Sequence, residues 1–249
     1  MIDRETLINL SKIHNLRPWQ QEKHYIQSAI LTVASEIPLI LKGGTYLWFF
    51  HGLNRFSEDL DFTALEPLHE NLPSKISESL FLLGIENNLK IISKGSKSLS
   101  FRISAKGPLY TSEKDLCHVY LEISTRESIL EKASALKLEN AGYSLPSKIV
   151  MGMNLTEVGA EKVRAILARN KARDLYDLNF LITEKNISFK EPLINEKLSY
   201  YGKKFAGDEF LKHVHARKGQ WNSELKSLIF GNLLKFDAVE RNVRKWISK

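Results

Sequence analysis

The chain has 249 residues, of which 43% are hydrophobic and 26% charged, values that are ordinary for a folded protein and exclude a disordered chain. This length suffices for one large domain or two modest ones. Lysine and arginine outnumber aspartate and glutamate by 36 − 29 = 7, which favours a polyanionic partner such as nucleic acid, although a chance excess explains the charge equally well.

The single cysteine, Cys117, excludes an internal disulfide and a multi-cysteine zinc site, and it suits a reducing compartment. The longest apolar runs, such as residues 46–50, are far too short to cross a membrane. The N-terminus is charged and has no apolar signal-peptide region. We therefore expect a cytoplasmic protein that does not associate with membranes.

Helices are expected over residues 3–36, where apolar side chains recur at helical spacing. Pro18 is expected to begin a second helix there, because proline is tolerated in the first turn of a helix. Residues 39–41 form a short apolar run that Gly43 and Gly44 close. This pattern predicts a buried strand that enters a tight turn.

After this turn the sequence predicts both helices and strands. A helix is expected over residues 45–51, a strand over 58–63 and a helix over 74–83. Three further strands are predicted by their apolar runs, over residues 89–93, 99–104 and 116–123.

The pattern changes character after residue 123. Residues 127–136 favour a helix, and 142–146 resemble a linker before a helical C-terminal half. The predicted fold class is α+β, a small mixed sheet flanked by helices. We expect N-terminal helices over 1–36, a core over 37–140 and a helical C-terminal subdomain over 141–249.

Asp59 and Asp61 are the residues that point most directly to chemistry. Residues two apart in a strand face the same side, so the two carboxylates repel each other unless a cation lies between them. A divalent ion with oxygen ligands, typically Mg²⁺, removes this repulsion and also binds nucleotide phosphates. A lone pair of this kind is more often a solvated strand face. The Gly43–Gly44 turn shifts the balance towards function, because glycine lets backbone N–H groups approach a phosphate.

The two motifs resemble a known signature. KGGTYL followed by RFSEDLDF is similar to the first block of the AbiEii family of nucleotidyltransferase toxins, which includes the MenT toxins. GAEKVRAILARNKARDLYDL, residues 159–178, is similar to the second block of that family. The resemblance covers roughly residues 39–180. It implies the fold of the DNA polymerase β-like nucleotidyltransferases, with the C-terminal subdomain completing the active site.

The resemblance assigns roles to Lys162 and Asp174 in the second block. Lys162 would contact the phosphates of the nucleotide, and Asp174 would be a further catalytic aspartate. Helical patterns cover residues 157–168 and 172–182. A straight helix would hold Lys162 and Asp174 about 18 Å apart at 1.5 Å per residue. The functional interpretation therefore predicts a bend near residues 170–171.

Other polar residues have weaker assignments. Glu122 lies on an expected strand and resembles the third carboxylate of polymerase β-like enzymes, although a solvent-facing strand glutamate is an equal alternative. Ser57 would touch the triphosphate, and Arg55 would clamp a phosphate or simply carry surface charge. Arg173 and Asp177 are expected to pair across a helix turn. The resemblance adds three residues of the turn as phosphate ligands, namely Gly43, Gly44 and Thr45.

Beyond residue 183 the resemblance fades into a basic tail with interleaved aromatic residues. Cations and aromatic rings together suit an RNA surface, although helical periodicity and core aromatics explain much of the same pattern. The residues concerned are Lys203, Lys204, Lys212, Arg217, Lys218, Arg241, Arg244 and Lys245, with Tyr200, Tyr201, Phe205 and Trp221.

The predicted activity is metal-dependent transfer of a nucleoside monophosphate from an NTP to an acceptor. Asp59 and Asp61 would bind Mg²⁺, or Mn²⁺ as an alternative. The resemblance implies the toxin of a toxin–antitoxin system, RNA and in particular the tRNA 3′ end as acceptor, and a cognate antitoxin protein as partner. Modification of a protein or a small molecule, or a non-catalytic RNA-binding or partner-binding role, remain the alternatives.

Overall fold

The computed structural model describes residues 1–139 and 142–248 of the chain, which divides into two compact units. Unit 1 comprises residues 1–46, 58–128 and 133–152, and unit 2 comprises residues 47–57, 129–132 and 153–249. The boundary that the sequence predicts between residues 140 and 141 lies outside the described residues. Within the described parts, no helix is both long and apolar enough to cross a membrane.

Unit 1 is built on a seven-stranded mixed sheet of order β3-β4-β5-β2-β1-β7-β6. Strands β2 and β5 are parallel, as are β1 and β7, and the remaining neighbours are antiparallel. The strands are β1 (Leu39–Lys42), β2 (Leu60–Ala64), β3 (Asn87–Lys94), β4 (Ser98–Ala105), β5 (Cys117–Ser124), β6 (Ser134–Leu138) and β7 (Lys148–Gly152). The first five lie close to their predicted ranges.

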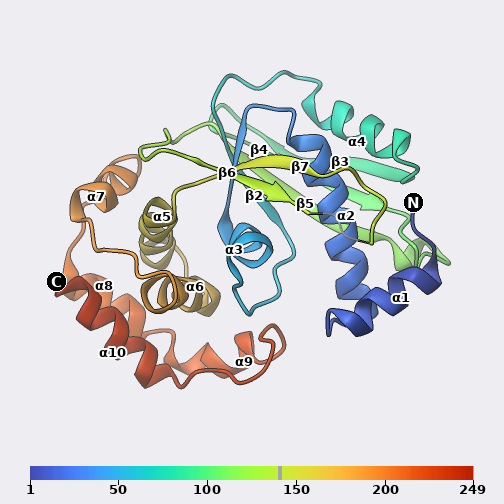
Figure 1. Cartoon of the computed structure of the whole chain (residues 1–249). Coiled ribbons are helices and arrows are strands. Elements are labelled where there is room, and N and C mark those ends of the chain that lie inside the picture. The colour runs from blue at the N-terminus through green and yellow to red at the C-terminus, as the bar shows by residue number, and fades with distance from the viewer. Residues whose placement is uncertain (140–141, 249) are drawn as a thin grey trace. The chain divides into compact units, whose positions relative to one another are not determined.

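Helices cover one face of this sheet (Figure 1). Helix α1 (Arg4–Ile13) packs on α2 (Pro18–Ala34), and α2 packs on β5 and on α4 (Leu72–Leu82). Pro18 occupies the first turn of α2, as its fixed φ angle predicts. The other face of β5 is polar, because its buried and accessible residues alternate along the strand. A short 3₁₀ helix, η1 (Glu113–Asp115), precedes β5.

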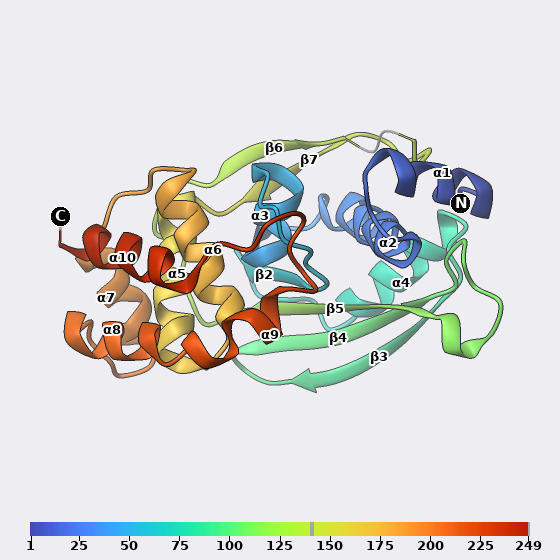
Figure 2. The same ribbon diagram turned by 90° about the horizontal axis from the view of Figure 1, so that it is seen from below.

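The prediction of a helix over residues 127–136 is wrong. Residues Ser134–Leu138 form strand β6, which pairs antiparallel with β7, and β7 pairs with β1 through Leu41 and Gly152. The sequence SALKL consists of good helix formers, so pairing with a neighbouring strand overrides local propensity here. The hairpin extends the sheet beyond β1, as Figure 2 shows.

Unit 2 is helical. Helix α5 packs on α6, α7 and α8, and α10 packs on α6 and α8. Its helices are α5 (Leu155–Ala168), α6 (Ala172–Thr183), α7 (Glu191–Ser199), α8 (Gly207–His215), η2 (Lys218–Gln220), α9 (Trp221–Leu225) and α10 (Phe236–Ile247). Helix α3 (Gly43–His51) begins in unit 1 and continues into unit 2. The predicted helical C-terminal half is confirmed from residue 155 onwards.

Candidate active site

The glycine turn of unit 1 is shaped around the carboxylate of Asp61. Strand β1 ends at Lys42, and Gly43 follows with φ +77°, a left-handed conformation that favours glycine. A Cβ atom on Gly43 would lie 2.2 Å from Oδ2 of Asp61. Because Lys42 and Asp61 are register partners, the carboxylate lies directly against the turn. Glycine is therefore required here both by conformation and by space.

Asp59 precedes the first residue of β2, and its position is fixed through the same turn. The buried hydroxyl of Thr45 donates a hydrogen bond to the backbone carbonyl oxygen of Asp59. This hydroxyl is therefore directed at the backbone of the carboxylate segment, which gives Thr45 a positioning contact. Gly44 is buried beside it.

Glu122 lies next to Asp61. The parallel β2–β5 ladder makes the two residues register partners, so their side chains share the sheet face opposite the buried Leu60 and Leu121. Glu122 is exposed, and Asp61 is half-buried. The expected third carboxylate thus occupies the neighbouring strand at the level of the pair.

The residues present suit a magnesium ion that also takes ligands from a substrate. In the described part of the chain, no group of three or more His, Cys, Asp or Glu side chains is arranged to hold a metal ion. Mg²⁺ is commonly bound through one or two carboxylates together with substrate phosphates. Asp59 and Asp61 supply oxygen ligands of that kind, and the missing Cβ of Gly43 makes room for the Asp61 carboxylate at the end of β1.

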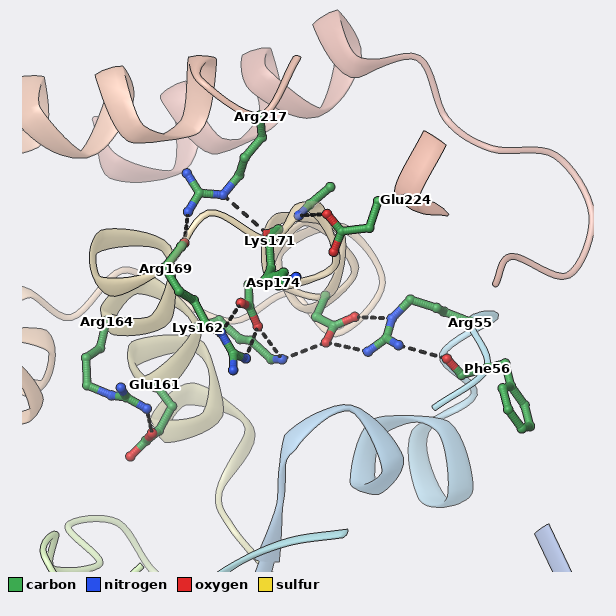
Figure 3. Close-up of polar contacts among 12 residues, drawn as sticks. Arg55, Phe56, Glu161, Lys162, Arg164, Arg169, Lys171, Asp174, Arg217 and Glu224 are labelled. Carbon is green, nitrogen blue, oxygen red and sulfur yellow. Dashed lines mark hydrogen bonds and ion pairs between the residues drawn. The ribbon is translucent and has the colours of Figure 1, made fainter. Parts of the chain in front are cut away.

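The predicted bend in the second block is confirmed. Helix α5 ends at Ala168 and α6 begins at Ala172, which brings two residues twelve positions apart into contact. The Lys162 ammonium lies 3.2 Å from Oδ1 of Asp174 and 2.7 Å from Oδ2 of Asp177 (Figure 3).

This lysine belongs to a charge cluster within unit 2, which we call the α5–α6 cluster: Arg55, Lys162, Arg169, Asp174 and Asp177. Arg55 donates two hydrogen bonds to Asp177, from Nε at 2.8 Å and from Nη2 at 2.9 Å. Arg169 donates two to Asp174, at 2.8 and 3.0 Å. Both aspartates are fully buried, whereas the Arg169 side chain is 53% exposed. The formal charge of the cluster is 3 − 2 = +1.

The cluster keeps both aspartates ionised. Burial by itself raises the pKa of Asp174, but Lys162 and Arg169 outweigh it and hold that pKa well below its usual range. Burial likewise opposes ionisation of Asp177, and Arg55 with Lys162 lowers its pKa overall. The carboxylates therefore carry charge throughout the neutral pH range, with their oxygens committed to cations.

Two residues have partners that the sequence did not predict. The Arg55 guanidinium was expected either to clamp a phosphate or to carry surface charge, but it is buried and is held by Asp177 and by the carbonyl oxygen of Phe56. Asp177 was expected to pair with Arg173 and pairs instead with Arg55 and Lys162. The signal for Asp177 was its position three residues after Asp174, which puts both on one helix face.

Arg169 and the bend itself depend on residues further along the chain. The buried guanidinium of Arg217 donates to the carbonyl oxygens of Arg169 and Lys171, at 2.5 and 3.3 Å (Figure 3), and to that of Ile166 at 2.6 Å. The carbonyls of Ile166 and Arg169 lie at the C-terminal end of α5, where the last carbonyls lack a partner in the helix, whereas that of Lys171 also accepts the N–H of Asp174 at 3.3 Å. Glu224 accepts the N–H of Ala172 at 2.8 Å and caps the start of α6.

Three other predictions need revision or closer definition. Arg217 and Trp221 were grouped with residues of an RNA surface, but both side chains are buried, so neither can contact RNA. Ser57 was expected to touch the triphosphate from the strand that carries Asp59, but β2 begins only at Leu60, so Ser57 and Asp59 both lie in the loop that precedes it. The first difference arises from the burial of Arg217 and Trp221 and the second from the length of β2, and neither can be predicted from the local sequence.

The comparisons with known proteins agree with this arrangement. The family model of the nucleotidyl transferase AbiEii toxin of type IV toxin–antitoxin systems matches residues 26–242 of the chain. The chain belongs to the AbiEii family. It is accordingly a nucleotidyltransferase toxin of a type IV toxin–antitoxin system. No curated protein sequence gives a significant match.

Solved structures show the same fold as this AbiEii family member. The chain is similar to MenT4, a nucleotidyltransferase toxin of Mycobacterium tuberculosis, with a TM-score of 0.67 and 20% identity over 100% of this chain and 89% of that one. It is also similar to JHP933 of Helicobacter pylori, with a TM-score of 0.61 and 20% identity over 92% of this chain and 90% of that one. The expected α+β nucleotidyltransferase fold is thereby confirmed.

Proposed function

We propose that this AbiEii-family chain transfers a nucleoside monophosphate from an NTP to an RNA acceptor in a reaction that depends on Mg²⁺. The observation that carries the proposal is the glycine turn, in which Gly43 leaves room for the Asp61 carboxylate at the end of β1. The N-terminus of helix α3, which begins at this glycine turn, together with two carboxylates that suit a divalent ion, is the equipment that nucleotidyl transfer requires.

Each chemical role is proposed for a named side chain. Asp59 and Asp61 would hold Mg²⁺, which, when bound, offsets the charge that develops on the triphosphate. Glu122 is exposed and adjoins Asp61, so it would take the proton from the attacking hydroxyl of the acceptor. The hydroxyl oxygen bonds to the α-phosphorus, the bond to the bridging oxygen breaks, and pyrophosphate leaves.

The α5–α6 cluster is proposed to bind phosphate groups. Its formal charge of +1 supports this role, because its two aspartates neutralise two of its three cations and one positive charge remains. Lys162 retains its proposed phosphate contact. Asp174 and Asp177 would act by positioning Lys162 and Arg169, since their oxygens already accept from those cations and from Arg55.

The open sheet face of unit 1 favours a single-stranded polyanion as acceptor. Arg102 and Tyr120 are register partners on β4 and β5, and the guanidinium carbon of Arg102 lies 5.9 Å from the centre of the tyrosine ring. Lys90 pairs with Arg102 from the edge strand, and Tyr120 is 41% exposed. Cations beside an exposed ring suit stacking with bases and contact with phosphates. Glu122 lies two residues from Tyr120 on the same face.

The test supplies each α-³²P-labelled NTP with Mg²⁺ and total tRNA, and separately with protein extract. Wild type should label RNA, and Asp59→Asn and Asp61→Asn should each lose at least about a hundredfold in rate, the scale of losing a charge-stabilising group. Asp208→Asn, which changes an exposed aspartate of α8, is the matched control and should retain activity. Label in protein with none in RNA would replace the RNA acceptor by the protein alternative. Equal labelling by Asp61→Asn and wild type would refute the assignment of the site.

A further inference from the structure

Unit 1 contains a cavity of about 610 Å³ that is separate from the glycine turn. Its walls come from Arg4 of α1, from Trp19 and Glu22 of α2, from the segment 109–116 and from His118 of β5. All of these elements belong to the same compact unit. The volume exceeds that of a single water site and is within the range of small-molecule pockets.

Glu22 is a buried polar group in the wall of this cavity. It is 4% exposed, and its Oε1 accepts a hydrogen bond from the Leu109 N–H at 2.6 Å. Within the described residues, this is the one hydrogen bond that its carboxylate makes. A Cβ atom at Gly107 would lie 2.4 Å from the same oxygen, so the carboxylate fits in this position only because residue 107 has no side chain. Oε2 is therefore available as an acceptor for the N–H of a ligand.

The charges of the lining argue against a site for a simple anion. Three cationic side chains line the cavity, and three carboxylates balance them, so the formal charge is 3 − 3 = 0. The cations are Arg4, Lys23 and Lys114, and the carboxylates are Glu22, Glu58 and Asp115. Such a lining suits an uncharged ligand that carries both hydrogen-bond donors and acceptors.

An aromatic side chain lines the same cavity. Trp19 is 44% exposed, and the apolar side chains of Ile8, Leu109 and Leu116 complete the lining. A flat ligand can stack against an exposed indole ring, and its edges can make van der Waals contact with the apolar side chains of the lining. A nucleobase combines this flat shape with the donor and acceptor groups that the polar lining requires.

One residue that lines the cavity is adjacent in sequence to the carboxylate pair. Glu58, which lines it, directly precedes Asp59, and an ion pair of 3.0 Å joins Glu58 to Lys23 of α2. Strand β5 begins at Cys117, whereas the register with β2 begins only at Leu121. The four intervening residues extend β5 about 13 Å past the start of β2, at 3.3 Å per residue. A ligand in the cavity would lie beyond the end of β2 that carries the carboxylates.

We propose that this cavity binds an unpaired nucleobase of the acceptor strand, stacked on Trp19 and hydrogen-bonded to Glu22. The inference rests on the proposed function and specifies how the acceptor is recognised. Binding of one base there holds the end of a single strand near Asp59 while leaving the phosphate-binding turn to the NTP. It also gives the enzyme a means of preferring one terminal base, since the four bases carry their N–H groups at different positions and Glu22 accepts only where an N–H is directed at it.

The experiment measures binding without transfer. Fluorescein-labelled RNA tetranucleotides A₄, C₄, G₄ and U₄ are titrated with the full-length Asp61→Asn protein, and anisotropy gives Kd. Trp19→Ala should raise Kd about tenfold, the scale of losing one stacked base, and Trp19→Phe should restore most of the affinity. Phe81→Ala, which removes an aromatic ring that is 64% exposed on α4 outside the cavity, is the matched control and should leave Kd unchanged.

Base preference is the second measurement. Glu22→Gln should change the ranking of the four tetranucleotides, because an amide can donate where a carboxylate only accepts. Arg4→Ala should weaken binding, whereas Lys12→Ala, an exposed change on the same helix, should not. An unchanged Kd in both Trp19→Ala and Arg4→Ala would overturn the proposal, as would tighter binding of free amino acids than of RNA.

The two proposals fail in distinguishable ways. If wild type transfers no nucleotide to RNA but the tetranucleotides bind in a manner that requires Trp19, the proposal of base binding in the cavity is supported and the proposal of transfer to RNA is refuted. If wild type labels RNA and Trp19→Ala changes neither Kd nor the KM for RNA, the cavity proposal falls and the proposed function stands. Where wild type labels RNA, the KM for the NTP should be unaffected by Trp19→Ala.

Discussion

Asp177→Asn should destabilise unit 2 by about 3–5 kcal/mol, the scale of leaving a buried charge without its partner. The wild-type carboxylate receives two hydrogen bonds from Arg55 and lies 2.7 Å from the Lys162 ammonium. Arg55 is 2% exposed and Lys162 is 7% exposed, so water cannot replace the lost charge. An amide keeps the shape of the side chain but presents a donor to two cations.

The assay is urea unfolding followed by tryptophan fluorescence in a Trp19→Phe background. The remaining tryptophans, Trp48, Trp221 and Trp246, all belong to unit 2, so the signal reports that unit. Lys218→Met is the matched control, because both side chains of its ion pair with Asp237 are more than half exposed, at 55% and 63%, and its loss should cost about 1 kcal/mol or less. A cost below about 1 kcal/mol for Asp177→Asn would refute the argument from buried charge.

The pH dependence gives an independent test of the same reasoning. The folded pKa of Asp177 is lowered because Arg55 and Lys162 outweigh the effect of burial. In the unfolded chain an aspartate titrates near about 3.9. The stabilising contribution is therefore complete above that pH and is lost as the pH falls towards the folded pKa. The difference between wild type and Asp177→Asn should be constant from neutral pH down to about pH 5 and should shrink below about pH 4.

Three further outcomes follow from other contacts. Gly43→Ala should abolish Mn²⁺ binding measured by electron paramagnetic resonance, because its methyl group would meet Oδ2 of Asp61 at 2.2 Å; binding equal to wild type would contradict the described turn. Arg217→Met should lower the free energy of unfolding in urea by about 2–4 kcal/mol, because buried carbonyl oxygens lose their donors. It should also speed amide hydrogen exchange around the α5–α6 bend, and unchanged exchange there would count against the capping role. His24 has its pKa lowered to about 3 by burial, so the folded state loses stability as the pH falls below about 6.5, where the unfolded histidine gains a proton. His24→Gln should reduce this loss between pH 6.5 and 5 by about 1 kcal/mol in thermal unfolding, and an identical pH profile would show that His24 is accessible to protons.

Local patterns predicted most of the core of unit 1. The run at residues 39–41, the glycines after it and the alternation over 116–123 each follow from side-chain spacing or from backbone freedom, and each lies close to its predicted place. The β6–β7 hairpin could not be found in this way. Strand β6 (SALKL) contains mostly helix formers and becomes a strand by pairing with β7, whereas β7 (KIVMG) carries β-branched residues and pairs with both β6 and β1.

The residues of the candidate site likewise fall into those that local sequence indicates and those that depend on distant contacts. The sequence indicated Asp59, Asp61 and Glu122. Strand alternation put Glu122 only on the polar face of its strand, and its register with Asp61 is visible only in the structure. The sequence could not indicate the partner of Asp177, because Arg55 lies 122 residues away and nothing local distinguishes a buried arginine from an exposed one. Arg217 was taken for a surface cation for the same reason, although its guanidinium is fully buried.

The position of Arg217 and Glu224 in the chain has a consequence for synthesis. The bend that brings Lys162 to Asp174 is held by hydrogen bonds from residues 46 to 52 positions downstream. A nascent chain that has left the ribosome only as far as α6 carries the lysine and both aspartates but lacks the groups that cap the break. The lysine can therefore be fixed only after residues 217 and 224 have been synthesised, so a chain that is interrupted after α6 would lack an ordered α5–α6 cluster.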